Sequence, residues 1–207
     1  MDTMRTSTRP IVVAIGGTTR ANSSSERVLR LAADRLTNAG AIVELFPGPS
    51  LDLPMYAPEV AHRNPAAQRL IAAMRRANGF LLASPGYHGS VSGLIKNALD
   101  YAEDLRDAPS PYWDGRAVGL ITSATGWQAT GSTMAALRAV VHALRGWPTP
   151  MGVTLNTCTN PFAEDGTLAD AAVDRQLTIL ADQVLSFATM KMLAASASAG
   201  FIRDHAG

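Results

Sequence analysis

Short runs of apolar residues alternate with longer amphipathic segments along this chain. Each run is continuous and shows no polar alternation, which is typical of parallel strands that are covered on both faces. The longer segments carry apolar residues at helical spacing; between residues 26 and 38, Val28, Leu29, Ala32 and Leu36 share one face, and Gly40 is a stop signal just beyond them. The predicted strands span residues 11–15, 42–46, 80–83, 117–122 and 153–155, and the predicted helices span residues 26–38, 66–76, 94–105, 132–144 and 168–192.

Five strand-and-helix units follow one another without a linker or an internal repeat, so the pattern predicts a single α/β domain, residues 11–193, built on a five-stranded parallel sheet. Residues 1–10 are expected to be a flexible leader, and the Ala-, Ser- and Gly-rich residues 194–207 a disordered tail. Because an open parallel sheet binds its ligand at the carboxyl ends of its strands, we expect function to lie in the loops after the first, third and fourth strands.

The composition narrows the class of protein. The chain has 207 residues, 47% of them hydrophobic and 17% charged, and a net charge of +1, which argues against a disordered chain and against binding to nucleic acid. No uninterrupted apolar stretch reaches the roughly 18 residues of a membrane-spanning helix, and residues 1–10 lack the apolar core of a signal peptide. The lone Cys158 provides neither an internal disulfide nor a CxxC motif, which favours the cytoplasm.

The loop after the first strand, residues 16–25, reads GGTTRANSSS. Two glycines permit a tight turn, five hydroxyl side chains and Arg20 supply donors, and the next helix offers free N–H groups, as a phosphate-binding loop requires. A Ser-rich helix cap beside a solvated arginine explains this loop, taken alone, equally well. The dinucleotide-binding motif GxGxxG and the P-loop motif GxxxxGK[ST] are absent. Residues 126–133 have the glycine spacing of a P-loop, but Ser132 stands where the lysine belongs. We therefore interpret residues 126–133 as a Gly-bracketed loop before a helix.

The loop after the third strand, residues 84–93, reads SPGYHGSVSG. Pro85 and three glycines bend the chain so that backbone N–H and C=O groups face outward, which suits recognition of the edge of a flat heteroaromatic ring flanked by Tyr87 and His88. No GxSxG elbow and no identifiable acidic partner accompany His88, which favours a loop contact over a general base.

Two segments, residues 17–25 (GTTRANSSS) and residues 84–101 (SPGYHGSVSGLIKNALDY), resemble the NADPH-dependent FMN reductase family, which has a GSxRxxSxN loop and a PEYNxSxPGxLKNxLD segment. Both occur in the family's order, each after its strand, and the resemblance extends from about residue 11 to about residue 185. It implies a flavodoxin-like, doubly wound parallel sheet with strand order 2-1-3-4-5, FMN as the cofactor and NADPH as the electron donor.

The resemblance also implies roles for individual residues. Thr18 replaces the family's usual serine and Ser25 its asparagine, while Gly86 replaces glutamate and His88 replaces asparagine. The implied FMN-binding residues are Gly17, Thr18, Arg20, Ser23 and Ser25 at the phosphate, Pro85, Gly86, Tyr87 and His88 along the isoalloxazine, and Ser123, Thr125 and Gly126 at the polar edge of the flavin. Because hydride transfer between stacked rings needs little from side chains, no catalytic acid or base and no metal ligand are assigned.

Two further features have both a functional and a structural interpretation. Trp127 either shields the flavin or meets the nicotinamide, or else is packed in the core or in a subunit contact, whereas Trp113 and Trp147 are expected to be structural residues in turns before strands. Lys96 and Asp100 lie in a segment that resembles the family's helix at the dimer interface; the alternative is that they belong to a solvated helix face.

These features predict a reductase that passes electrons from NADPH to FMN and then to a partner monooxygenase or a small acceptor such as a quinone, an azo dye or a metal oxyanion. The alternative is a non-catalytic FMN electron carrier, although such carriers are usually strongly acidic and this chain is nearly neutral. A third possibility is a phosphate-binding module without flavin. Because a monomer would leave the flavin and the helix at Leu94 open to water, we expect a homodimer or homotetramer.

Overall fold

The computed structural model describes residues 9–204 of the chain, with side-chain surroundings up to residue 197. The strands are β1 (Ile11–Gly16), β2 (Ile42–Pro47), β3 (Gly79–Tyr87), β4 (Ser90–Val91), β5 (Ala117–Ala124) and β6 (Trp147–Asn156). The helices are α1 (Ser24–Asn38), α2 (Pro65–Arg76), α3 (Gly93–Asp100), α4 (Trp127–Ala143) and α5 (Ala171–Asp204), and the 3₁₀ turns are η1 (Gly48–Leu51), η2 (Tyr101–Leu105) and η3 (Thr157–Thr159).

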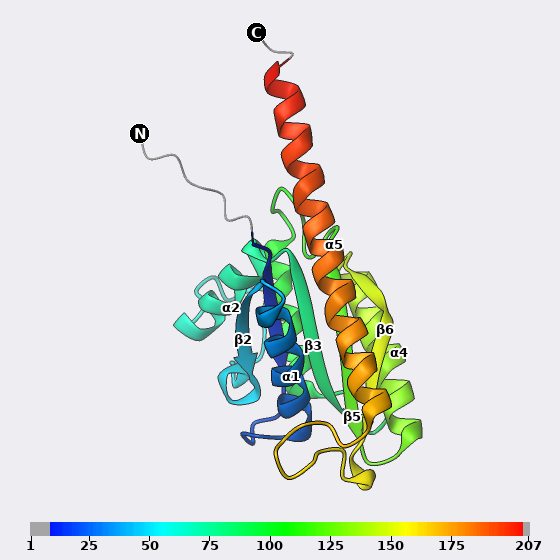
Figure 1. The fold of residues 1–207 in the computed structure, drawn as a ribbon. Helices are drawn as coiled ribbons and strands as arrows, with labels where there is room; N and C mark the ends of the chain where they lie inside the picture. Colours follow the sequence, from blue (N-terminus) through cyan, green and yellow to red (C-terminus); the bar gives the residue numbers. More distant parts are fainter. Residues whose placement is uncertain (1–8, 205–207) are drawn as a thin grey trace.

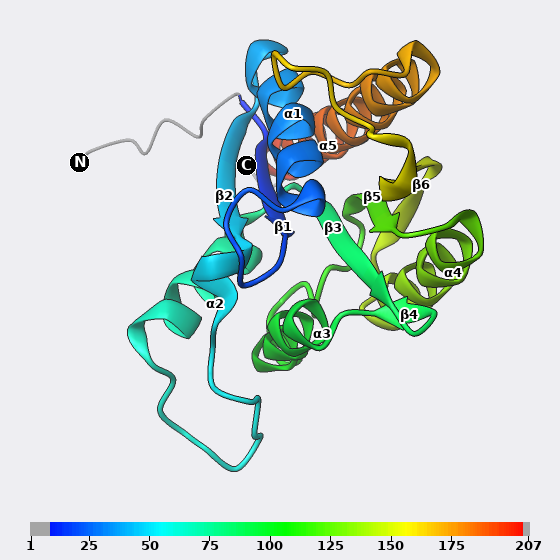
Figure 2. The same cartoon turned by 90° about the horizontal axis from the view of Figure 1, so that it is seen from below.

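The parallel strands lie in the order β2-β1-β3-β5-β6, and the short β4 pairs antiparallel with β3. Without β4, this is the predicted order 2-1-3-4-5, the flavodoxin-like arrangement, whose winding reverses between β1 and β3. Since the strands are parallel, their carboxyl ends meet at one edge of the sheet. The loops that follow them face the viewer in Figure 2.

Helices cover both faces of this sheet. α1 and α5 lie on one face, and α2, α3 and α4 lie on the other (Figures 1 and 2). Successive side chains of a strand point to opposite faces, so Val13 and Ile15 of β1 join the core beneath α2, α3 and α4, while Val12 and Ala14 join the core beneath α1 and α5. Burial on both faces explains why the strands are continuous apolar runs in the sequence.

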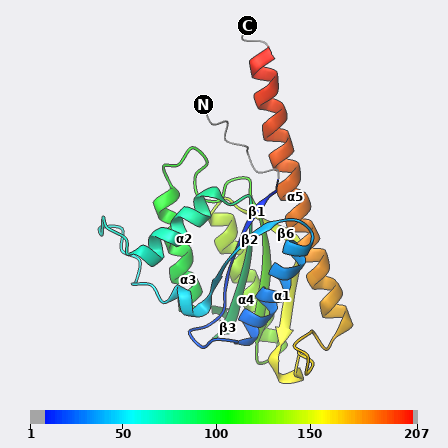
Figure 3. The ribbon, with the colours of Figure 1, turned by 60° about the vertical axis from the view of Figure 1, so that its left-hand side comes forward.

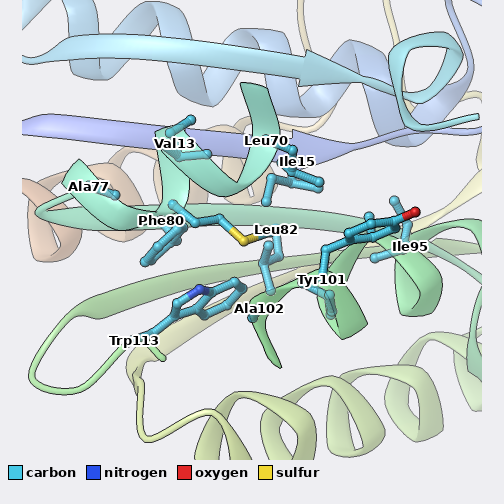
Figure 4. Close-up of a cluster of buried hydrophobic side chains, with 14 of the residues drawn as sticks. Val13, Ile15, Leu70, Ala77, Phe80, Leu82, Ile95, Tyr101, Ala102 and Trp113 are labelled. Carbon is cyan, nitrogen blue, oxygen red and sulfur yellow. The ribbon is translucent and has the colours of Figure 1, made fainter. Parts of the chain in front are cut away.

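Aromatic residues fill the core beneath α2, α3 and α4. Trp113 is fully buried and stacks on Phe80 with 4.1 Å between the ring centroids, and Tyr101 lies in the same cluster (Figure 4). Trp113 is therefore structural, as predicted. Trp147, by contrast, is not in a turn: it is the first residue of β6, is 55% exposed, and has its ring centroid 4.8 Å from that of Phe187.

The early start of β6 has a structural cause. The two prolines near its start, Pro148 and Pro150, discourage a strand prediction because proline cannot donate to a ladder. β6 is an edge strand, however, and its register against β5 shifts between Val118 and Leu120. An edge position with a register irregularity tolerates prolines, so the strand begins at Trp147 rather than at residue 153.

The last two helices also differ from the prediction. α4 begins at Trp127 rather than at residue 132, so most of the predicted Gly-bracketed loop is helical. α5 begins at Ala171 and continues to Asp204, through most of the segment that was expected to be a disordered tail; no proline interrupts it. Within the predicted leader, Arg9 donates hydrogen bonds to the Gly40 and Ala41 carbonyls. Residues 1–8 and 205–207 lie outside the described residues, so the expectations for them remain predictions.

Among residues 9–204, α5 is the helix that is long and apolar enough to cross a bilayer by length and composition; an 18-residue window within Ala171–Ala197 has a mean hydropathy of 1.3. Core helices meet the same criterion, so this is weak support for a membrane span. The first part of α5 packs on the sheet, with Leu177, Leu180 and Val184 fully buried. Its last part projects beyond the ends of the strands (Figures 1 and 3).

The long connection between η1 and α2 is attached to η2 by one ion pair. The Arg63 guanidinium donates two hydrogen bonds to the Asp104 carboxylate, at 2.7 and 2.9 Å, and the Tyr56 hydroxyl donates a third at 3.1 Å. The hydrogen bonds from Arg63 hold the pKa of Asp104 below its usual range, and burial beside Asp104 raises the pKa of Tyr56. These contacts fix a connection that has no regular secondary structure between residues 52 and 64.

We expect Asp104→Asn to lower the free energy of unfolding by about 1 kcal/mol at pH 7. A carboxyl group whose pKa is lower in the folded state stabilises the protein above the unfolded-state pKa and loses this contribution as the pH falls through the folded-state pKa. The difference between the variant and the wild type should therefore shrink below about pH 4. Urea unfolding at pH 7 and pH 3 measures it, and an equal difference at both values would contradict a role for the charge.

Candidate functional site

A hollow of about 480 Å³ lies at the carboxyl ends of the strands. We call it the strand-end hollow, and its lining residues are Thr18, Arg20, Ser23, Ser24, Ser25, Pro85, Gly86, Tyr87, His88, Ser123, Ala124, Thr125, Ala129 and Thr157. They come from the loops after β1, β3, β5 and β6, which are far apart in the sequence and close together in the fold (Figure 2). The volume lies in the range of small-molecule and cofactor sites.

At one end of the hollow, hydroxyl groups surround the start of α1. The Ser23 side chain accepts a hydrogen bond from the Glu26 N–H at 3.4 Å, and the Glu26 carboxylate accepts one from the Asn22 N–H at 3.2 Å. This arrangement resembles a capping box, except that the carboxylate accepts from the residue before the N-cap Ser23, and it helps to fix where α1 begins. Ser23 and Ser25 are almost fully buried, 3% and 1% exposed, with 3.4 Å between their hydroxyl oxygens.

The charges at this end favour an anion. The buried Glu26 carboxylate is already paired with Arg30, with 2.7 Å between the atoms. Within the described part of the chain, the exposed Arg20 guanidinium forms no hydrogen bond or ion pair; only its backbone bonds to the Thr18 hydroxyl. An unpaired guanidinium, several hydroxyls and a helix N-terminus together match the chemistry of a phosphate group.

A tight hairpin forms the opposite wall. β3 and β4 pair Tyr87 with Ser90, and the two residues between them, His88 and Gly89, have φ of 51° and 79°. Two consecutive residues with positive φ are typical of a type I′ hairpin turn, which suits the twist of the flanking strands. The turn holds the Tyr87 and His88 side chains exposed at the rim of the hollow.

Gly86 lies where α4 approaches the hairpin closely. A Cβ atom at Gly86 would lie 2.5 Å from the Thr133 hydroxyl and 3.2 Å from the Ala129 carbonyl oxygen. The glutamate of the family pattern therefore cannot be accommodated here unless α4 moves. In this protein the backbone of Gly86, and not a side chain, faces the hollow.

The loop between β5 and α4 is held by Asn156, at the end of β6. Its side-chain oxygen accepts hydrogen bonds from the backbone N–H groups of Gly126 at 3.1 Å and Cys158 at 3.0 Å. The Thr125 and Thr157 hydroxyls lie 3.3 Å apart. These contacts join two loops that line the hollow. The first N–H groups of α4 have no intrahelical partners, as at any helix start, and carry a partial positive charge.

We expect Asn156→Ala to lower the free energy of unfolding by about 2 kcal/mol, because two N–H groups lose their acceptor. The substitution should also lower the affinity of the strand-end hollow for any ligand. Asn156→Asp keeps an acceptor oxygen and is the matched control, with a smaller loss expected. Chemical unfolding and ligand titration of both variants measure this. Equal behaviour of the alanine variant and the wild type would show that Asn156 does not hold the two loops.

The predicted site residues fall into two groups. Ten line the strand-end hollow, and Gly17 and Gly126 do not. Gly17 has φ 115° and donates its N–H to the Ala83 carbonyl, so it shapes the turn after β1, while Gly126, with φ 109°, is the N-cap of α4. Four further residues line the hollow without having been predicted from the sequence: Ser24, Ala124, Ala129 and Thr157. Thr157 directly follows the last strand, and the rule that ligands bind at strand ends would have found it had it been applied to β6.

A second hollow adjoins the first. We call it the Trp127 hollow; it has about 490 Å³ and is lined by His88, Gly89, Thr125, Gly126, Trp127, Gln128, Ala129 and Ser132. His88, Thr125 and Ala129 line both hollows, so the two are direct neighbours. Trp127 is 60% exposed, which rules out packing in the core of this chain but not a subunit contact, the other structural interpretation. Among the described residues no cluster of His, Cys, Asp and Glu suits a metal ion.

Comparisons with known proteins identify relatives of this chain. Residues 10–159 match the family described as NADPH-dependent FMN reductase. The FMN-dependent NADPH-azoreductase of Staphylococcus aureus is 26% identical over 178 residues, which cover 83% of this chain and 91% of that protein. The azoreductase of the same description from Staphylococcus saprophyticus is 33% identical over 124 residues; here the alignment covers 58% of this chain and 61%, less than two thirds, of that protein.

Among solved structures, the flavoenzyme NAD(P)H:(acceptor) oxidoreductase FerB from Paracoccus denitrificans superimposes with a TM-score of 0.71. The superposition covers 86% of this chain and 97% of that chain, at 20% sequence identity. At this identity the likeness supports the shared fold and carries no residue roles.

Proposed function

Because the chain belongs to the NADPH-dependent FMN reductase family, and is therefore an oxidoreductase that uses FMN and NADPH, we propose that the strand-end hollow binds the FMN and that the electrons pass on to a small-molecule acceptor. One observation carries the proposal: an unpaired arginine with clustered hydroxyls and a hairpin suited to a flat ring line the same hollow. Neither feature alone separates a flavin site from a helix cap or an ordinary turn.

At the phosphate end, we assign binding to Arg20 and to the hydroxyls of Thr18, Ser23 and Ser25. Burial of Ser23 and Ser25 and the pairing of Glu26 with Arg30 support this assignment, since no uncompensated carboxylate would oppose the phosphate. Charge-assisted hydrogen bonds from a guanidinium are among the stronger polar contacts available to such an anion.

At the ring end, the hairpin of β3 and β4 and the start of α4 would hold and polarise the flavin. Bound FMN supplies a ring that accepts a hydride from NADPH and passes the electrons on. The Pro85–His88 backbone offers N–H and C=O groups along one side, and the partial positive charge at the start of α4 would stabilise negative charge on the reduced ring. No side chain is assigned as an acid or a base.

The proposal also covers the electron acceptor. The azoreductase relatives favour a small molecule, with release of reduced FMN to a monooxygenase as the other route within the family. Membership in a reductase family and the net charge of +1 both argue against a non-catalytic electron carrier, which would need an acidic docking face. The lone, exposed Cys158 supports a cytoplasmic location as part of the same proposal.

A homodimer or homotetramer is also proposed. The exposed face of α3 carries the Lys96–Asp100 pair, with 2.6 Å between the charged atoms, which is compatible with a subunit contact or with a solvated face. Light scattering at micromolar concentration measures the oligomeric state, and a monomer mass would overturn the oligomer.

The visible spectrum of the purified protein tests the function directly. After incubation with FMN and desalting, we expect a retained flavin band at about 450 nm that anaerobic NADPH bleaches in one two-electron step. A retained band that NADPH leaves unchanged would favour an electron carrier. Protein that retains no flavin and does not oxidise NADPH when FMN is in excess would overturn the proposal.

A further inference from the structure

Trp127 is the tryptophan without a ring partner inside the described part of the chain. Trp113 stacks on Phe80 and Trp147 lies against Phe187, at 4.1 and 4.8 Å between centroids. The Trp127 indole makes no such contact and no hydrogen bond within residues 9–197, and it is 60% exposed. A large aromatic side chain that is held at the first turn of a helix and left uncovered suits stacking on a ligand.

The Trp127 hollow lies next to the strand-end hollow, with no phosphate-loop residue in its lining. A molecule in it therefore reaches the ring end of the strand-end hollow. The lining has no carboxylate, lysine or arginine; its side-chain N–H donors are His88, Gln128 and the Trp127 indole, and Thr125 and Ser132 add hydroxyls. Such a lining suits a flat, apolar molecule with a few acceptor atoms and does not suit a small inorganic ion.

We propose that the Trp127 hollow is the subsite for the electron acceptor, and that stacking on Trp127 selects flat aromatic acceptors over acceptors without an aromatic ring. The inference rests on the proposed function, because it places the acceptor beside the ring of FMN. For a quinone, the hydride of NADPH and one proton from solvent reduce the two carbonyls to hydroxyls, and NADP⁺ is released. His88 and Gln128 lie where they would donate to the acceptor's oxygen or azo nitrogen atoms.

The test uses the FMN-loaded protein with 2-methyl-1,4-naphthoquinone as the flat acceptor. Equilibrium dialysis of the oxidised protein without NADPH measures quinone binding in the absence of turnover. We expect Trp127→Ala to bind the quinone about tenfold more weakly than the wild type. Trp127→Phe keeps a stacking ring, so its affinity for the quinone should fall less than about threefold. Trp147→Ala removes an almost equally exposed indole outside both hollows and is the matched control.

Steady-state rates with NADPH add a second measurement. We expect the kcat/KM of Trp127→Ala to fall about tenfold more for the naphthoquinone than for ferricyanide, an acceptor without an aromatic ring. Unchanged quinone binding by Trp127→Ala would overturn the subsite. So would equal losses in kcat/KM for both acceptors and in the rate of flavin bleaching by NADPH. Either result would leave the proposed function standing. A wild-type protein that retains no FMN would overturn the proposed function, and the inference with it.

Discussion

Replacing Arg20 with alanine is expected to weaken FMN binding by about 30-fold or more and to change the free energy of unfolding by less than about 0.5 kcal/mol. The guanidinium is exposed and has no partner within residues 9–204, so its loss removes no contact that holds the fold. A bound phosphate, in contrast, loses a charge-assisted hydrogen bond or a bidentate pair. Titration of the apoprotein with FMN, followed by flavin fluorescence, measures the affinity.

Two comparisons make this result specific to the phosphate. Riboflavin has the same ring without the phosphate, so its affinity should be the same in Arg20→Ala and the wild type. Arg69, an exposed arginine of α2 that does not line the strand-end hollow, provides the matched control, and Arg69→Ala should bind FMN normally. Arg20→Lys keeps the charge without the planar fork and should lose less than alanine. Unchanged FMN affinity in Arg20→Ala would refute the phosphate assignment.

The Gly48→Ala substitution is expected to lower the free energy of unfolding by at least about 3 kcal/mol and to abolish tight FMN binding. Gly48 begins η1 and lies against the loop after β1. A Cβ atom there would lie 1.8 Å from the Thr18 carbonyl oxygen and 2.5 Å from two other backbone atoms of Thr18. Backbone atoms cannot turn away as a flexible side chain does, so the Thr18 loop must move away from η1.

A glycine in open space is the control for this prediction. Gly131 lies in α4, and a Cβ atom added there meets nothing within 4 Å. Because alanine costs less backbone entropy than glycine in a helix, Gly131→Ala should raise the free energy of unfolding by about 0.5–1 kcal/mol. Urea unfolding of both variants measures the contrast, and near-normal stability and FMN affinity of Gly48→Ala would show that the loop after β1 adapts freely.

The two substituted residues differ in whether the sequence alone reveals their importance for the site. Arg20 is visible in the sequence as a charged residue in a hydroxyl-rich loop, and its effect is expected on binding alone. Gly48 has no such signature in the sequence. Its importance comes from the contact between the chain after β2 and the loop after β1, two neighbouring strands of the sheet.

The fold class was predictable from the sequence because it depends on local regularities. Continuous apolar runs indicate strands buried on both faces, and the segments between them show helical spacing. The predicted order of the five parallel strands is confirmed. Two of the errors among the strands have separate reasons: the edge position of β6 tolerates prolines, and β4 has only two residues, too few to form a pattern.

The candidate site was predictable in its parts. The hydroxyl-rich loop with Arg20 and the Pro85–His88 turn each have a local signature, because glycine, proline, serine and arginine impose backbone shape or supply donors through short-range chemistry. Both signatures are also what made the resemblance to the FMN reductase family recognisable. The sequence by itself therefore determined the fold class, the family and most of the residues around the strand-end hollow.

Only the tertiary structure decided how these parts meet. That four loops surround one hollow, that Asn156 joins two of them, and that α4 packs too closely on Gly86 for a side chain follow from the strand order and the packing of α4 on the hairpin. The exposure of Trp127 likewise depends on residues distant in sequence. Sequence patterns record the preferences of neighbouring residues, whereas close approach and solvent exposure depend on segments that the fold brings together.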